Sequence, residues 1–493
     1  MTAATSTRGW LLALLAFALA VACTAGPTTE SASTDRPGQP ATSAARPAAP
    51  PDPPRGWVGP LDQPTTLQPA PTAAAPAGTV EDVVIVHPDR RRQQFDGYGA
   101  ALTEASARLI NGLPEPQRTG VVRQIVDPRD GAGIDVVRVP MGASDFATSH
   151  YTYDDVPAGS TDPHLSRFSI APDERDTIPV LRDGLAVNPH LQIIGTPWTA
   201  PAWMKTNQSL YGGTLDGAWF GAYAQYFVRF VQGYAEKGIT IAAVEVQNEP
   251  QHEASDYPTM VLDASRAADF VAHHLGPALR AAGLQTRILG YGENWDDTTY
   301  PATLLSDDAA AAHLSGVSFH CYAGDVGAQG RIHDRFPHEE IHVTECSGGT
   351  WAPDMSANLL WNAENLLISA PNLHARTVLL WNLALDPGGG PHRGGCNGCR
   401  GVLTIDPHAG TITANVEWTV LALGGRVTDP NASRVETTVT DPELDVAAFA
   451  NADGSSALLV LNTASRSRTF MISAGARAFT AVVPPASVAS YRW

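Results

Sequence analysis

Positive charge is scarce in this sequence, and so are long apolar runs and cysteines. Among 493 residues, 32 are Lys or Arg and 50 are Asp or Glu, so the formal net charge is −18. This balance argues against nucleic acid or an anionic membrane surface as the main partner. The apolar run at residues 10–22 is too short to span a bilayer. With 43% hydrophobic and 17% charged residues, the composition is typical of a soluble globular protein.

The N-terminal residues have the pattern of an export signal. Arg8 supplies a positive charge before the apolar run, which ends in Ala-Val-Ala and then Cys23. Small residues before a cysteine resemble the bacterial lipoprotein cleavage box, although Leu19 lies one place too early for the best match. Cleavage near the same alanines without lipid is the alternative. We therefore expect an exported protein, either extracellular or anchored to the cell surface through lipid on Cys23.

The five cysteines favour disulfides over a metal site. Setting Cys23 aside, an even number remains in an exported chain, which favours two disulfides. Cys321 and Cys346 would join adjacent strand ends, with two free buried thiols as the alternative. Cys396 and Cys399 form one CxxC pair without a second pair or nearby His ligands, so no metal is expected.

Composition changes along the chain indicate five segments. Pro, Ala, Thr and Ser dominate the stretch after the signal, which therefore cannot bury enough apolar surface to fold. The predicted segments are an export signal at 1–23, a disordered tether at 24–78, strands joining a β-sandwich at 79–94, a barrel at 95–417 and a C-terminal β-sandwich at 418–493.

Eight short apolar runs alternate with amphipathic stretches in the central segment, which is the pattern of a (β/α)8 barrel. The predicted strands are residues 97–101, 134–141, 192–197, 241–247, 287–291, 316–322, 341–345 and 377–385. The predicted helices include residues 219–236, 264–282 and 357–368. A doubly wound open sheet is the competing fold, but Gly97-Tyr98-Gly99-Ala100 lacks the third glycine of its phosphate-binding turn. Short alternating runs at 445–449, 457–461, 469–472 and 481–483 predict an all-β C-terminal domain.

Two glutamates at the ends of apolar runs are the strongest functional signal: Ile-Ala-Ala-Val-Glu-Val-Gln-Asn-Glu249-Pro and Ile-His-Val-Thr-Glu345. If Glu249 follows the fourth strand and Glu345 ends the seventh, both lie at the mouth of the barrel, where active sites are built. Two carboxylates about 5 Å apart are the machinery of a retaining glycosidase. A general acid must be protonated near neutral pH, so we expect burial and a neighbouring carboxylate to raise the pKa of Glu249.

Aromatic and amide side chains follow the same strands. Trp198 and Trp381 could stack on a pyranose ring, although buried tryptophans also serve as ordinary core residues. Asn248 could hydrogen-bond a hydroxyl beside the reacting carbon. These residue types predict a sugar-binding pocket around the two glutamates.

Several motifs together resemble glycoside hydrolase family 30, which includes lysosomal glucosylceramidase and bacterial and fungal β-1,6-glucanases. They are Phe-Asp-Gly-Tyr-Gly-Ala-Ala-Leu-Thr-Glu, Val-Arg-Val-Pro-Met-Gly-Ala-Ser-Asp-Phe, Thr-Pro-Trp-Thr-Ala-Pro-Ala-Trp-Met-Lys-Thr-Asn, Val-Gln-Asn-Glu-Pro and Trp-Asn-Leu-Ala-Leu-Asp-Pro-Gly-Gly-Gly-Pro. The resemblance runs from about residue 95 to the C-terminus. It implies a (β/α)8 barrel with a side β-sandwich and retaining hydrolysis of β-glycosides without a metal or organic cofactor.

The resemblance also implies individual roles. Glu249 matches the acid/base and Glu345 the nucleophile. The residues that match sugar contacts are Asp145, Trp198, Asn248 and Trp381. Those that match supports of the two glutamates are Tyr322 and Arg138, and Arg138 and His320 could alternatively serve only to satisfy buried carboxylates.

The loop after Gly390-Pro391 departs from the lysosomal enzyme. It reads His-Arg-Gly-Gly-Cys-Asn-Gly-Cys-Arg-Gly and looks closer to the β-1,6-glucanases, with Asn397 near the place of a sugar-binding asparagine. We therefore expect a monomeric, exported, retaining β-glucosidase acting on a carbohydrate or glycolipid. β-Xylosidase or β-fucosidase activity and a non-catalytic carbohydrate-binding barrel are the alternatives.

Overall fold

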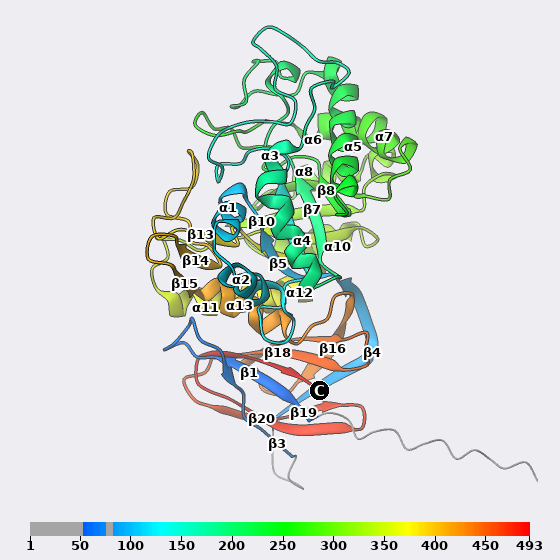
Figure 1. Cartoon of the computed structure of the whole chain (residues 1–493). Helices are drawn as coiled ribbons and strands as arrows, with labels where there is room; N and C mark the ends of the chain where they lie inside the picture. Colours follow the sequence, from blue (N-terminus) through cyan, green and yellow to red (C-terminus); the bar gives the residue numbers. More distant parts are fainter. Residues whose placement is uncertain (1–52, 75–81) are drawn as a thin grey trace, which may run out of the picture. The chain divides into compact units, whose positions relative to one another are not determined.

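The computed structural model describes residues 53–74 and 82–493 of the chain (Figure 1). The predicted export signal and Cys23 lie outside these described residues. Within 53–74 and 82–493, no helix combines the length and the apolar character that crossing a membrane requires.

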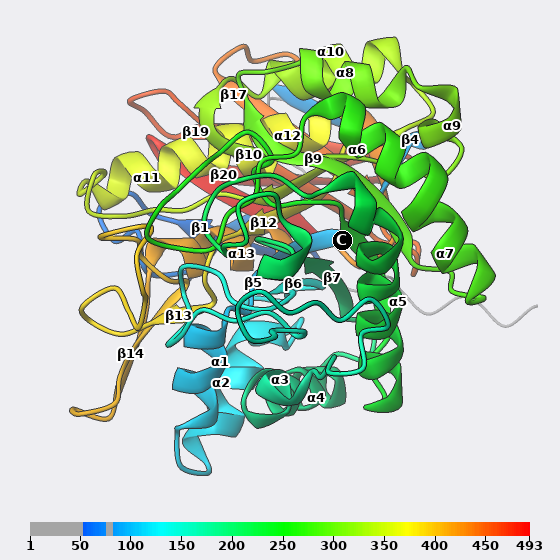
Figure 2. The same ribbon diagram turned by 90° about the horizontal axis from the view of Figure 1, so that it is seen from above.

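Eight parallel strands close into a barrel, as the sequence predicted. The strands follow one another around the ring in chain order, and β12 pairs with β5 to complete it. Figure 2 shows β5, β6 and β7 surrounded by helices. The barrel strands are β5 Gly97–Ala101, β6 Val136–Pro140, β7 Gln192–Thr196, β8 Ile241–Glu245, β9 Arg287–Trp295, β10 Gly316–Gly324, β11 Glu340–Glu345 and β12 Ala375–Leu380.

The barrel strands are continuous apolar runs because both of their faces are buried. All residues of β5 and β6 are buried, as in parallel sheets covered by helices. The barrel interior holds a layer of side chains from five strands rather than a pore. This layer consists of Val136, Ile194, Ala243, Leu289 and Leu379.

Helices cover the outside of the barrel, and their apolar faces pack on the strands. The predicted helix at 219–236 is α5, and the predicted helix at 264–282 is a continuous run with a wider π-helical turn in its middle. The helices are α1 Glu104–Asn111, α2 Gln117–Val126, α3 Ala171–Arg175, α4 Thr177–Val187, η1 Ala202–Met204, η2 Gly217–Trp219, α5 Phe220–Glu236, α6 Ala264–Phe270, η3 Val271–Leu275, α7 Gly276–Ala281, α8 Thr299–Leu305, α9 Asp308–Ala311, α10 Gly327–Arg335, α11 Met355–Asn362, η4 Ala363–Ser369, α12 Ala370–Asn372 and α13 Val416–Gly425.

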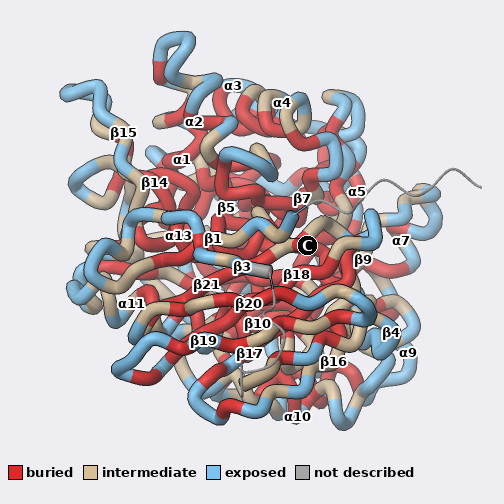
Figure 3. The backbone as a smooth tube through the Cα atoms, turned by 90° about the horizontal axis from the view of Figure 1, so that it is seen from below, coloured by how far each residue is buried: buried red, intermediate tan, exposed pale blue. Residues whose placement is uncertain are grey.

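A ten-stranded, largely antiparallel sheet with its own core forms the β-sandwich, and Figure 3 shows β18, β20 and β21 as mostly buried. The long strand β4 enters this sheet beside β16 and β19 and continues through Asp96 into β5 of the barrel. The sandwich strands are β1 Arg55–Gly59, β2 Gln68–Pro69, β3 Thr72–Ala74, β4 Val83–Phe95, β16 Ala432–Val439, β17 Leu444–Ala450, β18 Ser456–Asn462, β19 Arg468–Ala474, β20 Arg477–Val483 and β21 Ser487–Arg492.

A third, small sheet follows the barrel and precedes α13. It consists of β13 Ala384–Leu385, β14 Leu403–Asp406 and β15 Thr411–Ala414. The predicted eighth barrel strand at 377–385 is therefore two strands, β12 and β13, which belong to different sheets.

Helix α13 occupies the place where the sequence predicted the start of short strands. All ten of its residues are buried, and it contacts β5 of the barrel and β1 and β21 of the sandwich. A helix covered on every side is apolar on every side, so it lacks the amphipathic pattern that reveals a surface helix.

The predicted disordered tether at 24–78 is wrong for residues 55–74, which contain three strands. Residues 55–59 form β1, which pairs with β21 over five positions, and β3 pairs with β20. Val58 is buried, and the half-buried Trp57, Leu61 and Leu67 pack against the core. These few apolar residues suffice because neighbouring strands supply the rest of the hydrophobic surface and the backbone hydrogen bonds.

Candidate active site

A cavity of about 570 Å³ opens at the C-terminal ends of the barrel strands, within the size range typical of small-molecule sites. A larger hollow of about 690 Å³ lies on the outer surface beside α5 and α7 and contains none of the predicted residues. The lining residues of the cavity are Asp145, Trp198, Asn248, Glu249, His252, Glu253, Ala254, Ser255, Asp256, Tyr257, Tyr322, Glu345, Trp351, Trp381, Gly395, Cys396 and Cys399.

Glu249 is held in an uncommon backbone conformation four residues after β8. Its φ of 43° lies in the left-handed region, which costs a non-glycine residue on the order of 1 kcal/mol. The Glu249 amide donates to the Gly292 carbonyl at 2.9 Å, and the Asn248 amide donates to Pro197 at 2.9 Å. Backbone bonds to strands on both sides of β8 therefore fix this strained turn, and Pro250 follows it.

Glu345 ends β11 and receives two hydrogen bonds from opposite sides. The buried Arg138 guanidinium donates to Oε2, and the Tyr322 hydroxyl donates to Oε1 at 2.8 Å. Arg138 also donates to Asn248 Oδ1 at 2.7 Å, which orients that amide. These bonds fix the position of the Glu345 carboxyl group in the cavity.

The two glutamates converge as their placement in the sequence predicted. One carboxylate oxygen of Glu249, one of Glu345 and a ring nitrogen of His320 all lie within 4.8 Å of one another. The carboxyl groups of retaining glycosidases lie about 5–5.5 Å apart, whereas those of inverting enzymes are separated by roughly 6.5–9.5 Å. The spacing therefore fits attack by one carboxylate with no water between the pair.

His320 lies between the two glutamates and changes the electrostatics predicted for Glu249. Its Nδ1 is 3.2 Å from Glu249 Oε1, and its Nε2 is 4.0 Å from Glu345 Oε2. Burial opposes the charged form of both partners, but the charge of Glu345 and the bond to Glu249 raise the pKa of His320. For Glu249, burial is outweighed by His320, which lowers the pKa of the carboxyl. The expected rise in the pKa of Glu249 is therefore wrong for the free protein.

Glu245 is a further buried acid that the sequence interpretation did not single out. It ends β8, is fully buried and accepts from Arg138 Nε at 2.7 Å. Burial opposes its ionisation, but Arg138, His320 and two hydroxyl donors lower its pKa to about 2. The sequence did contain a signal for this role, because Glu245 lies four residues before Glu249 in an otherwise apolar strand. A carboxylate buried there needs a buried cation as its partner.

One end of the cavity is enclosed by the predicted sugar contacts. The rings of Trp198 and Trp381 stack with centroids 5.3 Å apart, and each is 3% exposed. Asp145 lies at the same end, where burial and the charges of Glu345 and Glu249 raise its pKa to about 7. The carboxyl group of Asp145 is therefore partly protonated near neutral pH.

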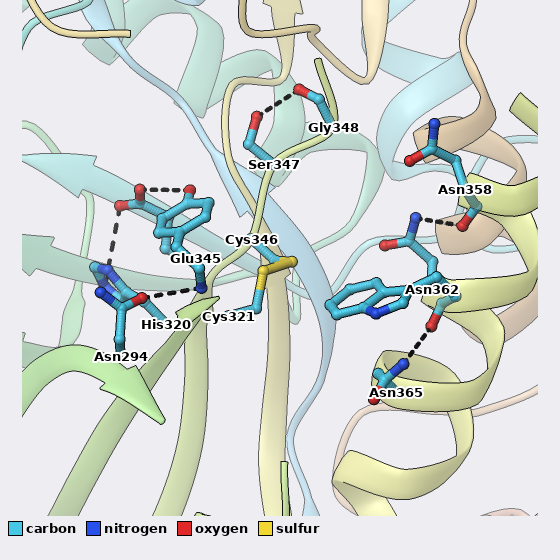
Figure 4. Close-up of a disulfide and its surroundings, with 12 residues drawn as sticks. Asn294, His320, Cys321, Glu345, Cys346, Ser347, Gly348, Asn358, Asn362 and Asn365 are labelled. Atoms are coloured by element: carbon cyan, nitrogen blue, oxygen red, sulfur yellow. Dashed lines mark hydrogen bonds and ion pairs between the residues drawn. A yellow bond between two sulfur atoms is a disulfide. The ribbon is translucent and has the colours of Figure 1, made fainter. Parts of the chain in front are cut away.

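Both predicted cysteine pairs are bonded in the structure. The disulfide joins Cys321, inside β10, to Cys346, the residue after β11, with a Cα–Cα distance of 5.2 Å. The two cysteines are next to His320 and Glu345 in the chain (Figure 4). Cys396–Cys399 closes a turn that borders the cavity. The Cys396 amide donates to Asp145 Oδ2 at 3.2 Å, so this turn helps to position that carboxyl.

Asn397 is the predicted site residue that the structure leaves outside. It is exposed and does not belong to the cavity lining, because it occupies the tip of the Cys396–Cys399 turn while both cysteines border the cavity. Five lining residues had no signal in the sequence, since they lie on loops whose course depends on tertiary structure. These are His252, Glu253, Asp256, Tyr257 and Trp351.

Glu249, His320 and Glu345 are also close enough to bind a metal ion. Arg138 donates directly to Glu345, however, and places a permanent positive charge beside this group. That charge disfavours a cation there, so the donors fit an acid/base pair better than a metal site.

Sequence comparisons agree with this geometry. Residues 95–395 match the glycosyl hydrolase family 30 TIM-barrel domain, and residues 431–491 match the family 30 beta sandwich domain. The chain belongs to glycoside hydrolase family 30. Like its relatives in this family, it is an O-glycosyl hydrolase rather than a non-catalytic carbohydrate-binding barrel.

Relatives of this chain carry names that point to different substrates. An endo-1,6-β-D-glucanase of Neurospora crassa is 35% identical over 355 residues, which cover 70% of this chain and 71% of the relative. The lysosomal acid glucosylceramidase of Mus musculus is 28% identical over 440 residues, or 83% of each chain. A solved endo-β1,6-glucanase structure superposes with a TM-score of 0.84 at 30% identity, covering 89% of this chain and 99% of the other.

Proposed function

We propose that this family 30 enzyme is a retaining β-glucosidase that hydrolyses β-1,6-linked glucan by double displacement. Glu345 acts as the nucleophile and Glu249 as the acid/base. The observation that carries the proposal is the approach of one oxygen from Glu249 and one from Glu345 to within 4.8 Å, which is compatible with the close carboxyl groups of a retaining pair.

In the first step, Glu345 attacks the anomeric carbon and Glu249 protonates the departing glycosidic oxygen. The Glu249–His320 pair holds one proton, which lies on His320 in the free protein. When substrate displaces water from the cavity, the Glu249 carboxylate and the His320 imidazolium lose solvation. The neutral forms of both groups are then favoured. The proton therefore returns across 3.2 Å from Nδ1 to Glu249 Oε1.

In the second step, Glu249 is a carboxylate and takes a proton from water, which attacks the same carbon and releases Glu345. Arg138 and Tyr322 stabilise the Glu345 carboxylate before attack and again as it departs. Trp198, Trp381, Asn248 and Asp145 surround the sugar ring, and Asp145 near its pKa of about 7 can donate to or accept from a hydroxyl.

The substrate assignment is supported by the names of the relatives. The 35% identical Neurospora crassa relative and the structure at TM-score 0.84 are both named as endo-1,6-β-glucanases. Glucosylceramide is the competing substrate, supported by the 28% identical mouse relative. β-Xylosides and β-fucosides compete as well, because one small substituent in a pocket discriminates by only about 1–3 kcal/mol.

Product analysis tests this proposal. The purified protein is incubated separately with β-1,6-glucan, glucosylceramide, an aryl β-xyloside and an aryl β-fucoside, and NMR follows the anomer first released. We expect the highest kcat/KM on β-1,6-glucan and retention of the β-anomer. Faster turnover of any other substrate would overturn the substrate assignment, and an α-anomer would overturn the mechanism.

We also propose export of a monomer, with Cys23 as the candidate lipid attachment point. The N-terminal sequence pattern and the two disulfides, which persist in oxidising compartments, support export. Cell fractionation with and without Cys23→Ala separates the two forms of export: a lipoprotein leaves the membrane fraction in the variant, whereas a plainly secreted protein is unaffected.

A further inference from the structure

Two large aromatic side chains at the open end of the cavity are exposed to solvent. Tyr322 is 43% exposed and bonds Glu345, so the glutamate accounts for its position. Trp351 is 55% exposed, follows β11 by six residues and lines the same cavity. An indole left this exposed beside a site for sugars marks a surface that a ligand could cover.

The loop that carries Trp351 is fixed by backbone bonds to the Cys396–Cys399 turn. Gly349 forms an isolated bridge with Cys399, the Thr350 amide donates to Gly398 at 2.9 Å, and the Arg400 amide donates to Gly348 at 2.9 Å. The indole also lies directly over Gly349, where an added Cβ would overlap the ring. The ring is therefore held in place before any ligand arrives, which reduces the entropic cost of binding.

The two ends of the cavity differ in a way that assigns a direction to the substrate. Asp145, Trp198 and Trp381 are almost fully buried, and in the proposed function they surround the sugar whose anomeric carbon reacts. The departing part of the substrate must therefore extend toward the open end. Trp351 and polar groups such as His252 and Asp256 line the cavity and are exposed to solvent.

We propose that Trp351 is the stacking platform for the second sugar unit, the one on the leaving-group side of the scissile bond. Its indole covers the apolar face of that pyranose, while nearby polar side chains bind its hydroxyls. This inference rests on the proposed β-1,6-glucanase function and adds a binding site to it. Trp351 is a specificity residue rather than part of the reacting machinery.

The test compares a substrate that has a second sugar with one that has none. β-Glucosyl fluoride loses only fluoride, whereas a β-1,6-linked glucotriose places sugar on the open side. We expect Trp351→Ala to lower kcat/KM on the trisaccharide by on the order of tenfold and to leave β-glucosyl fluoride unchanged, as expected when roughly 50 Å² of apolar contact is lost.

Three further variants control for structural effects. Trp351→Phe keeps a flat ring and should retain most of the trisaccharide activity. Gly349→Ala keeps the indole but displaces it, and should reduce the trisaccharide activity alone. Trp361→Ala removes an indole that is 41% exposed on α11 outside the cavity lining, and should change neither activity.

The outcomes distinguish failure of the Trp351 site from failure of the proposed function. Equal losses on both substrates in Trp351→Ala, or no loss on either, would overturn the role of Trp351 while leaving the proposed function intact. A wild-type protein that hydrolyses β-glucosyl fluoride but not the trisaccharide would overturn the proposed function and the second-sugar site together.

Discussion

At the scale of single residues, Arg138 links the acids beneath the cavity. Its guanidinium donates to Glu245, Glu345 and Asn248, and it is fully buried. A buried guanidinium is tolerated only because several acceptors surround it. If one acidic acceptor is removed, part of the positive charge of Arg138 is left buried without a partner.

We expect Glu245→Gln to destabilise the protein by about 3 kcal/mol at neutral pH, because it breaks a buried ion pair. The pKa of Glu245 is lowered from 4.5 to about 2, so its stabilisation is present above pH 4.5 and is lost as the pH falls toward 2. Urea unfolding of both proteins at neutral pH and below pH 4.5 should show the difference narrowing in acid. A difference that widens in acid contradicts this interpretation.

His320 should set the basic limb of the activity profile. The Glu249–His320 pair binds one proton with an affinity to which both groups contribute, so removing His320 weakens that binding. We expect His320→Gln to move the basic limb of kcat/KM to lower pH. His342→Gln, which changes a buried histidine bonded to Thr377 away from the cavity lining, is the matched control. An unchanged or raised basic limb in His320→Gln refutes the shared proton.

At the scale of elements, the two disulfides should differ in what they contribute. Cys321–Cys346 closes a 25-residue separation and joins two barrel strands, so its loss in a Cys→Ser double variant should cost about 3 kcal/mol of unfolding free energy. Cys396–Cys399 closes a separation of three residues and should contribute less to stability.

The Cys396–Cys399 disulfide supports Asp145 and the Trp351 loop, so the double variant that lacks it should mainly lose kcat/KM. Thermal unfolding and trisaccharide kinetics on both variants check the contrast, and a reversed order contradicts it.

At the scale of the whole molecule, strands that come from the Pro-rich N-terminal region complete the sandwich. A chain of residues 82–493 lacks β1, which pairs with β21 at five positions. It also lacks the buried side chain of Val58, which belongs to β1. We expect its thermal midpoint to fall by several degrees relative to a chain of residues 53–493, since a loss of 1 kcal/mol shifts a large domain by roughly 2–4 °C. Equal midpoints would show that these strands contribute nothing to stability.

The barrel could be predicted from the sequence because its strands are short, wholly buried and separated by amphipathic helices. The convergence of Glu249 and Glu345 followed from that topology, as strand ends in a closed barrel meet at one mouth. Other features were hidden for physical reasons. Residues 55–74 contain few apolar side chains and fold only against a sheet made by the C-terminus. The electrostatics of Glu249 depend on His320, which is 71 residues away in the chain.

The most direct test of the account is the site at which a mechanism-based label attaches. A 2-fluoro-β-glucosyl fluoride slows release of the glycosyl-enzyme, and peptide mapping by mass spectrometry then identifies the modified residue. We predict a single label on Glu345 in the wild-type protein and none in Glu345→Gln, with both proteins folded by circular dichroism. A label on another residue, or retained turnover in Glu345→Gln, would contradict the proposed mechanism.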